Sequence, residues 1–281
     1  MTFATPSIAD KRRVFHQLHE QSCFMLPNPW DLASARLLQG LGFKAIATTS
    51  AGFAWSQGRA DNHVTRDMVL AHLNDMVTAI DIPVNADFES GFAATASEVE
   101  ENVRLAIETG VAGLSIEDST GNANQPLYTI DEACERMRAA RRAIDKAGDD
   151  VLLVGRAECF LVGRPDLDET IARLKAYAHV GADCLYAPGI HTREQIAAVV
   201  AAVSPKPVNL LVAATSELTV ADIAQLGVRR ISVGGALARA AWGGFLRAAR
   251  QLAEHGSFDG FANAATGKEL NELFAENHER S

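Results

Sequence analysis

Eight short apolar segments alternate with longer amphipathic segments along this chain, and this alternation limits the folds that the chain can adopt. The apolar segments have the length and residue types of buried β-strands, and the segments between them have helical periodicity. Strands that alternate with helices form parallel sheets through right-handed crossovers. The predicted strands span residues 23–26, 45–49, 83–87, 113–117, 151–156, 184–187, 208–212 and 231–233.

A single (β/α)8 TIM-type barrel is the natural closure of eight such units over 281 residues. A doubly wound open sheet is the alternative, but no GxGxxG motif follows the first strand. No linker or low-complexity tract divides the chain, so one domain is expected over residues 1–281. Helices are predicted, for example, from residue 31 to about Gly40 and over residues 97–109, 131–147 and 167–178. A final helix over 266–279 carries Leu270, Leu273 and Phe274 on one apolar face.

The composition excludes several classes of partner. The formal net charge is −9 and no cluster of Lys or Arg forms a basic patch, so a nucleic-acid partner is not expected. The four cysteines lack a CxxC spacing, which indicates reduced thiols rather than disulfides or a zinc site. No apolar run reaches membrane-spanning length and the first residues do not resemble a secretory signal, so we expect a cytoplasmic protein with no membrane partner.

Acidic side chains stand where predicted strands end. Asp87 and Glu89 follow the third strand, Glu117 and Asp118 follow the fourth, and Asp61 lies in the loop after the second. The carboxyl ends of parallel strands surround one mouth in a barrel, so these groups are expected to converge. Carboxylates packed together repel one another unless a cation neutralises them, and oxygen ligands suit Mg²⁺, with Mn²⁺ as the alternative ion.

An anion site is predicted beside these acids. The turn Thr49-Ser50-Ala51-Gly52 offers backbone N–H groups, and Arg156 at the end of the fifth strand offers a planar fork of donors. Asn209 in the seventh strand is a further candidate for contact with a small carboxylate substrate. Such a site suits enolate chemistry, in which a metal ion and donors stabilise negative charge on a 2-oxo oxygen.

Each of these residues also has a simpler interpretation. Asp87 and Glu89 could cap a helix, and Thr49 and Ser50 could be turn residues only. Asn209 could satisfy backbone groups inside the barrel. Asp118 is expected to be structural, either as a cap or as a partner of Arg156.

Several ordered motifs resemble the isocitrate lyase/phosphoenolpyruvate mutase superfamily over nearly the whole chain. The motifs are Asn28-Pro29-Trp30-Asp31-Leu32-Ala33-Ser34-Ala35-Arg36, Thr48-Thr49-Ser50-Ala51-Gly52, Asp87-x-Glu89-x-Gly91-Phe92, Ile116-Glu117-Asp118 and Gly155-Arg156-Ala157-Glu158. Ala178-x-x-Gly181-Ala182-Asp183 and Leu226-Gly227-Val228-Arg229-Arg230-Ile231-Ser232 add two more blocks.

The resemblance implies a modified (β/α)8 barrel that is a homotetramer and exchanges its C-terminal helix between subunits. It places Asp87 as the direct metal ligand, with Asp61, Glu89 and Glu117 reaching the ion largely through water. It implies substrate contacts from Thr49, Ser50, Ala51, Gly52 and Arg156. Arg156, Asp61 and Thr49 are the candidate catalytic residues.

One segment departs from the family pattern. Isocitrate and methylisocitrate lyases carry a Lys-Lys-Cys-Gly-His segment after the fourth strand, whereas residues 117–127 here contain no Cys, His or Lys. The mutase branch has a longer gating loop with Lys and Asn at this place. The expected function is a Mg²⁺-dependent lyase or decarboxylase acting beside a 2-oxo or 2-hydroxy carboxylate. The alternatives are a P–C bond enzyme, of the phosphoenolpyruvate mutase or phosphonopyruvate hydrolase type, and a non-catalytic barrel that binds 2-oxo acids.

Overall fold

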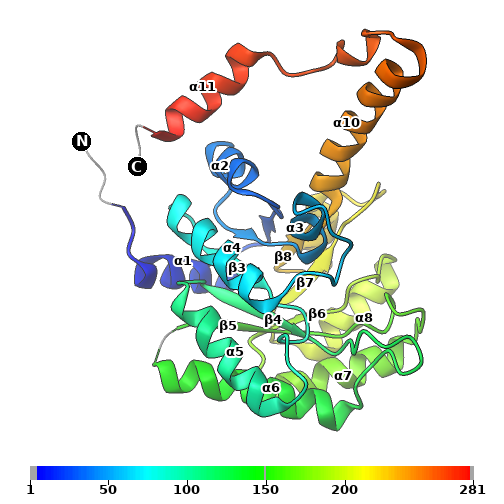
Figure 1. Cartoon of the computed structure of the whole chain (residues 1–281). Coiled ribbons are helices and arrows are strands. Elements are labelled where there is room, and N and C mark those ends of the chain that lie inside the picture. Colours follow the sequence, from blue (N-terminus) through cyan, green and yellow to red (C-terminus); the bar gives the residue numbers. More distant parts are fainter. Residues whose placement is uncertain (1–4, 149, 279–281) are drawn as a thin grey trace.

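The chain folds into a barrel of eight parallel strands, seen in a computed structural model that describes residues 5–148 and 150–278 (Figure 1). The strand order is β1-β8-β7-β6-β5-β4-β3-β2. A backbone hydrogen bond of 3.1 Å from Ala47 N to the Pro27 carbonyl links β2 to the end of β1. The predicted (β/α)8 barrel is therefore confirmed, and the open sheet is not adopted. The strands are β1 (Phe24–Leu26), β2 (Ile46–Ala47), β3 (Val84–Asp87), β4 (Gly113–Glu117), β5 (Leu152–Arg156), β6 (Cys184–Tyr186), β7 (Val208–Leu211) and β8 (Arg230–Ser232).

Helices surround the barrel, and their N-termini lie toward the end where the strands finish. Six of them begin at a threonine whose hydroxyl accepts a hydrogen bond from a backbone N–H in the first turn: Thr49, Thr65, Thr95, Thr129, Thr192 and Thr219. The predicted helices agree with the observed ones within about two residues. The helices are α1 (Ile8–Glu20), α2 (Leu32–Gly40), α3 (Ser50–Ser56), α4 (Arg66–Ala79), α5 (Ala96–Glu108), α6 (Ile130–Ala147), α7 (Leu167–His179), α8 (Arg193–Val203), α9 (Val220–Gln225), α10 (Ala236–His255) and α11 (Gly267–His278), with a 3₁₀ turn η1 (Asp259–Phe261).

The interior of the barrel has a polar layer as well as an apolar one. Arg230 is almost fully buried. Its Nε donates to Asn209 Oδ1 at 2.8 Å, and its Nη1 donates to Asn85 Oδ1 at 3.3 Å. These bonds satisfy a charge that would otherwise be costly to bury. Cys184 lies in the same interior, and all four cysteines are free, as predicted.

Helix α1 closes the barrel at the end where the strands begin. Phe15 is fully buried in the interior cluster. Lys11 Nζ donates to the carbonyls of Val77 (2.9 Å) and Ile80 (2.5 Å) near the end of α4. Arg12 donates to the Ile107 carbonyl (2.9 Å) near the end of α5 and to the Val111 carbonyl (3.0 Å). The cations therefore satisfy helix C-terminal carbonyls, which attract positive charge.

The C-terminal part of the chain stands away from the barrel. Figure 1 shows α10 projecting outward and α11 crossing back toward α2. Trp242, Phe245 and Phe258 are more than one-third exposed. The tail helix is confirmed over Gly267–His278, and residue 279 lies outside the described residues. In the part of the chain that the structure describes, no helix combines the length and apolarity needed to cross a bilayer.

His19 on α1 generates a testable pH dependence. Its Nδ1 lies 2.8 Å from the Phe15 carbonyl and its Nε2 lies 3.4 Å from Arg230 Nη1, so Nε2 has a cation where a proton would go. Burial, reinforced by the Arg230 charge, lowers the pKa of His19 from 6.5 to about 3. In the unfolded chain, His19 takes up a proton as the pH falls below about 6.5, whereas in the folded protein it stays neutral down to about pH 3. The stability that neutral His19 contributes above pH 6.5 is therefore lost as the pH falls from about 6.5 to about 3.

We expect His19→Gln to flatten the fall in unfolding free energy between pH 6.5 and 4, by up to about 1.4 kcal/mol per pH unit. Urea unfolding followed by circular dichroism at a series of pH values measures this slope. His255→Gln is the matched control, because the His255 side chain is 62% exposed near the end of α10. Equal slopes in wild type and His19→Gln would show that His19 does not carry the effect.

Candidate active site

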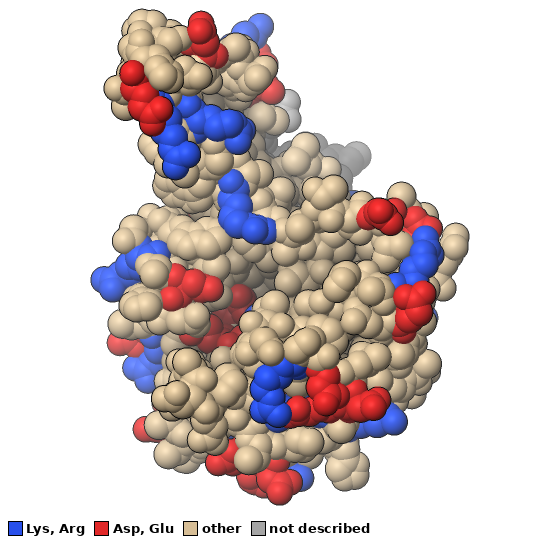
Figure 2. All heavy atoms as spheres, turned by 90° about the vertical axis from the view of Figure 1, so that its right-hand side faces the viewer, with Lys and Arg blue, Asp and Glu red and all other residues tan. Residues whose placement is uncertain are grey.

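The acidic groups predicted at the strand ends gather at the end of the barrel opposite α1. In Figure 1, α1 lies on the left and the loops that follow the strands lie on the right. Figure 2 turns this right-hand side toward the viewer and shows Asp and Glu atoms, in red, within a hollow of that face. Asp87, Glu117 and Arg156 end β3, β4 and β5, and Glu117 is directly opposite Arg156 in the strand pairing.

Asp87 is held by groups from the start of α3 and from the end of β5. Its Oδ2 accepts a hydrogen bond of 3.0 Å from Ser50 N, and its Oδ1 accepts one of 3.2 Å from Arg156 Nη1. Its own backbone N donates to Thr48 Oγ1 at 2.9 Å. The carboxylate is therefore fixed at the mouth, with its side chain 16% exposed.

Glu89 and Glu117 lie on the same side of the mouth. Glu89 has a φ of 47°, in the left-handed region that non-glycine residues rarely adopt, and its carbonyl accepts from Glu117 N at 3.0 Å. Burial, then the charges of Asp87 and Asp61, raise the pKa of Glu89 to about 8. Burial is also the largest cause that raises the pKa of Glu117 well above its ordinary value. Glu89 Oε1 is buried and has no hydrogen-bond partner among the described residues.

Arg156 is the cation at the centre of this cluster. Its Nη1 lies 3.2 Å from both Asp87 Oδ1 and Glu117 Oε2, and its Nε pairs with Glu158. Its guanidinium carbon lies 5.2 Å from the centre of the Tyr186 ring. Burial opposes the charge of Arg156, but the carboxylates of Glu158 and Glu117 outweigh it and hold its pKa above the ordinary value.

The cluster carries more carboxylates than one arginine neutralises. In residues 5–148 and 150–278, no group of three or more His, Cys, Asp and Glu side chains is arranged as a ready metal cluster. A magnesium ion does not need one, because Mg²⁺ takes one or two direct carboxylate ligands and keeps several waters. Asp87 and the unpartnered Glu89 oxygen, with Glu117 beside them, fit such an ion.

The predicted anion turn is the start of helix α3. Thr49 is its N-cap, with Oγ1 accepting from Gly52 N at 3.3 Å. A Cβ on Gly52 would lie 2.6 Å from Thr49 Cγ2 and 2.9 Å from Trp30 Cβ, so this close packing requires glycine. The Ser50 amide is already bonded to Asp87, as described above. Asp61 lies at the exposed edge of the site, where partial desolvation and the Asp87 charge raise its pKa.

Asn209 lies deeper in the barrel than the acids do. It is fully buried, and its Nδ2 donates to Ser232 Oγ at 2.9 Å while its Oδ1 accepts from Arg230. Both ends of the amide are therefore occupied by the interior polar layer. This placement gives no support to the predicted contact between Asn209 and a substrate.

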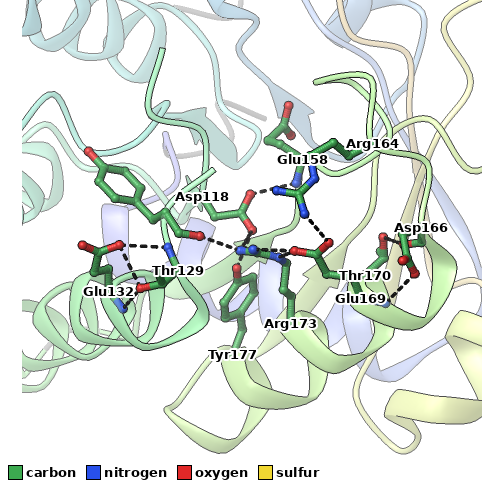
Figure 3. Close-up of polar contacts among 11 residues, drawn as sticks. Asp118, Thr129, Glu132, Glu158, Arg164, Asp166, Glu169, Thr170, Arg173 and Tyr177 are labelled. Atoms are coloured by element: carbon green, nitrogen blue, oxygen red, sulfur yellow. Dashed lines mark hydrogen bonds and ion pairs between the residues drawn. The ribbon is translucent and has the colours of Figure 1, made fainter. Parts of the chain in front are cut away.

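Asp118 belongs to a buried network behind the strand ends, shown in Figure 3. It accepts from Glu158 N at 2.8 Å, from Tyr177 Oη at 2.5 Å and from Arg173 Nη1 at 3.0 Å. Asp118 has the expected structural role, but of the two predicted forms the pairing with Arg156 is not found, because its side chain pairs with Arg173 of α7. The sequence signal that was missed is the spacing of Arg173 and Tyr177, which places both on one face of a helix.

The segment that departs from the family pattern forms a small exposed hairpin. Ser119 pairs with Leu127, and Thr120 N donates to the Pro126 carbonyl at 3.0 Å. Asn122 Oδ1 accepts from Asn124 N at 2.9 Å, so this side chain is used within the hairpin. Residues 121–125 are exposed.

Comparisons with known proteins agree with this geometry. The family model described as phosphoenolpyruvate phosphomutase matches residues 15–253. An oxaloacetate decarboxylase of Paraburkholderia xenovorans (strain LB400) is 31% identical over 230 residues, which cover 79% of this chain and 74% of the relative. A solved lyase/mutase-type protein of Burkholderia cenocepacia J2315 is 47% identical, with a TM-score of 0.92 over 95% of this chain and 97% of that one. Oxaloacetate acetylhydrolase in complex with oxalate has a TM-score of 0.83 at 27% identity, over 97% and 96% of the two chains.

The family model covers all eight strands and every strand-end residue described above, and the solved relatives share the fold over 95–97% of this chain. This chain therefore belongs to the phosphoenolpyruvate phosphomutase family, within the isocitrate lyase/phosphoenolpyruvate mutase superfamily.

Proposed function

We propose that the protein is a Mg²⁺-dependent lyase that breaks a carbon–carbon bond beside a 2-oxo or 2-hydroxy carboxylate through an enolate. The observation that carries this proposal is the excess of buried carboxylates around Arg156, with one Glu89 oxygen left unpartnered. A buried excess of negative charge is costly unless a cation compensates it. In an enzyme that binds its substrate through a metal ion, such an excess of negative charge would hold the ion.

Asp87 is the proposed direct ligand, and Glu89, Glu117 and Asp61 are proposed to reach the ion largely through water. A bound Mg²⁺ acts as a Lewis acid that polarises a carbonyl oxygen. The raised pKa values of Glu89 and Glu117 describe the carboxylates without that charge. Mn²⁺ has similar ligand preferences and is the alternative ion.

The chain's own residues supply binding and charge stabilisation. In a 2-oxo acid such as oxaloacetate, the bond from C3 to its carboxylate breaks, CO2 leaves, and the electron pair forms an enolate whose oxygen carries the negative charge until C3 takes up a proton. In a 2-hydroxy acid, the hydroxyl loses its proton, the C2–C3 bond breaks to leave a 2-oxo acid, and the electron pair forms the enolate of the other fragment. Arg156 is the cation placed to stabilise that charge and to hold the substrate carboxylate. The Ser50 and Ala51 amides are proposed to bind the same unit, which requires Ser50 N to leave Asp87, and Thr49 fixes the turn that presents them.

The relatives support this chemistry. Their descriptions name an oxaloacetate decarboxylase and a 2-methylisocitrate lyase, and similar structures include an oxaloacetate acetylhydrolase and a 2,3-dimethylmalate lyase. These names share a small carboxylate and the cleavage of a bond within it. We therefore propose a 2-oxo or 2-hydroxy acid as the substrate.

The exposed hairpin favours a second candidate, a barrel that binds 2-oxo acids without turnover. An enolate needs protection from water until a proton reaches the correct carbon. Residues 121–125 are exposed, Asn122 is bonded within the hairpin, and the segment 119–127 contains no Cys, His or Lys that could serve as a general acid. A turnover screen distinguishes the two candidates.

We expect Asp87→Ala to abolish Mg²⁺-dependent turnover because it removes the direct metal ligand. The screen follows release of pyruvate and phosphate from oxaloacetate, methylisocitrate, isocitrate, dimethylmalate and phosphonopyruvate. Binding of Mn²⁺, followed by electron paramagnetic resonance, gives a second readout that should also be lost. Asp67→Ala is the matched control, since the Asp67 side chain is 77% exposed.

The screen can reject the proposal in three ways. Unchanged turnover in Asp87→Ala would contradict the proposed metal site. Release of phosphate from phosphonopyruvate would show that the protein cleaves a P–C bond instead of a C–C bond. Oxalate binding without turnover on any compound would favour the non-catalytic barrel.

Asp118 is proposed as a positioning residue, because it holds the amide of Glu158, whose side chain pairs with Arg156. We expect Asp118→Asn to lower the unfolding free energy by about 3 kcal/mol, since it breaks a buried ion pair with Arg173. At temperatures where the variant remains folded, turnover should fall by about 10- to 100-fold, which is the usual effect of removing a residue that orients the side chains of a metal site. Asp150→Asn, at a side chain that is 73% exposed, is the control. Normal turnover in a destabilised Asp118→Asn would leave Asp118 with a structural role only.

The homotetramer with an exchanged C-terminal helix stays a prediction, supported by the exposed apolar side chains of α10, including Trp242 and Phe245. Such side chains are expected to be covered by neighbouring subunits. Sedimentation velocity should give a species of four chains, and a monomer at micromolar concentration would contradict the prediction.

A further inference from the structure

A cavity of about 730 Å³ lies over the loops that follow β5, β6 and β7, and β5 is the strand that ends at Arg156. No part of the mechanism proposed above uses it. Carbon makes up most of its wall, with one leucine from the loop after β5, one isoleucine after β6 and a continuous apolar run from the end of β7. The apolar lining residues include Leu161, Ile190, Leu211, Val212, Ala213 and Leu218.

Leu211 lines the cavity and also packs against the interior of the barrel. Leu211 follows Asn209 by two positions on β7, so both side chains point to the same side of the strand, toward the barrel axis. Leu211 packs against the interior cluster that contains Tyr186, and the Tyr186 ring faces the Arg156 guanidinium. Leu161 belongs to the turn that begins at Glu158, since its N donates to the Glu158 carbonyl at 2.9 Å. A substrate held by Arg156 would therefore have this apolar wall on its β6–β7 side.

The charged groups around the cavity do not favour a second carboxylate in it. Arg193 is paired with Asp222 at 2.8 Å, and Arg239 donates to the Ala213 carbonyl. Glu194 and Glu217 are exposed on the rim and add negative charge. A distal carboxylate would meet Glu194, Glu217 and a largely apolar wall, and the Arg239 guanidinium is already bound to the Ala213 carbonyl, whereas an alkyl group gains by leaving water for the apolar part of the wall.

We infer that this cavity binds an alkyl substituent of the substrate, so that the protein acts on 2-oxo or 2-hydroxy acids with an apolar tail. The inference rests on the proposed function, because Arg156 and the metal site fix the acid end of the molecule. It assigns the acid end to β3–β5 and the tail to β6–β7.

Isothermal titration calorimetry in magnesium-containing buffer tests the inference. The ligands are oxalate, which has no tail, and the series pyruvate, 2-oxobutanoate and 2-oxopentanoate. Burial of each added methylene should tighten binding by about fourfold. 2-Oxoglutarate has the same chain length as 2-oxopentanoate but ends in a carboxylate, and it should bind more weakly.

Two variants locate the effect in the cavity. Leu211→Ser and Leu161→Ser should each lower the ratio of 2-oxopentanoate affinity to oxalate affinity, by about three- to tenfold. Leu161 is 52% exposed, so its replacement is compatible with folding even if Leu211→Ser is not. Leu41→Ser is the matched control, at a leucine that is 71% exposed beyond the end of α2.

The outcomes separate this inference from the proposed function. If oxalate binds but affinity does not rise along the series, or if 2-oxoglutarate binds more tightly than 2-oxopentanoate, the inferred binding of an apolar tail is wrong. The proposed binding of the acid end by Arg156 and the metal site is then unaffected. An unchanged affinity ratio in Leu161→Ser and Leu211→Ser would also overturn it. If oxalate itself does not bind, the proposed function fails and the tail inference fails with it.

Discussion

Repulsion among buried carboxylates at the ends of β3, β4 and β5 is the constraint on which the rest of this site depends. Arg156 lies between Asp87 and Glu117 and pairs with Glu158, yet Glu89 keeps an oxygen without a partner. A barrel chosen for stability alone would not keep this excess of charge. The strain is local, because Glu89 also has a left-handed backbone, and both features point to a site that binds a cation and an anion.

The rest of the fold keeps these groups in place. Helix α1 closes the opposite end of the barrel with Phe15 and ties itself to carbonyls of α4 and α5 through Lys11 and Arg12. Asp118 joins the ends of β4 and β5 to α7. The hydrogen bonds that orient the site therefore come from rigid elements, which hold side chains more accurately than loops do.

The barrel and the grouping of the acids could be predicted from the sequence, because strands leave a local pattern and parallel strands bring their ends together. The prediction of β4 matches the observed strand at both ends, and Asp87, Glu89 and Glu117 do meet. Long-range contacts leave no such pattern. Lys11 and Arg12 resemble surface residues until carbonyls from distant helices are found beside them, and nothing near Asp118 indicates that Arg173 is its partner. Asn209 follows the same rule, since its partner Arg230 lies on a different strand.

The two sides of the mouth differ in chemistry, and this difference limits how a substrate can lie. From β3 to β5 the walls carry charge and suit a carboxylate with its 2-oxo group, whereas beyond Tyr186 the run from Leu210 to Ala214 is apolar. A molecule with a carboxylate at one end and an alkyl group at the other satisfies both walls in one orientation only. Reversal would place the carboxylate against Leu211 and the tail among the acids, and both contacts are unfavourable. Specificity in this barrel can therefore arise from the contrast between neighbouring strands, without a dedicated residue for each substrate atom.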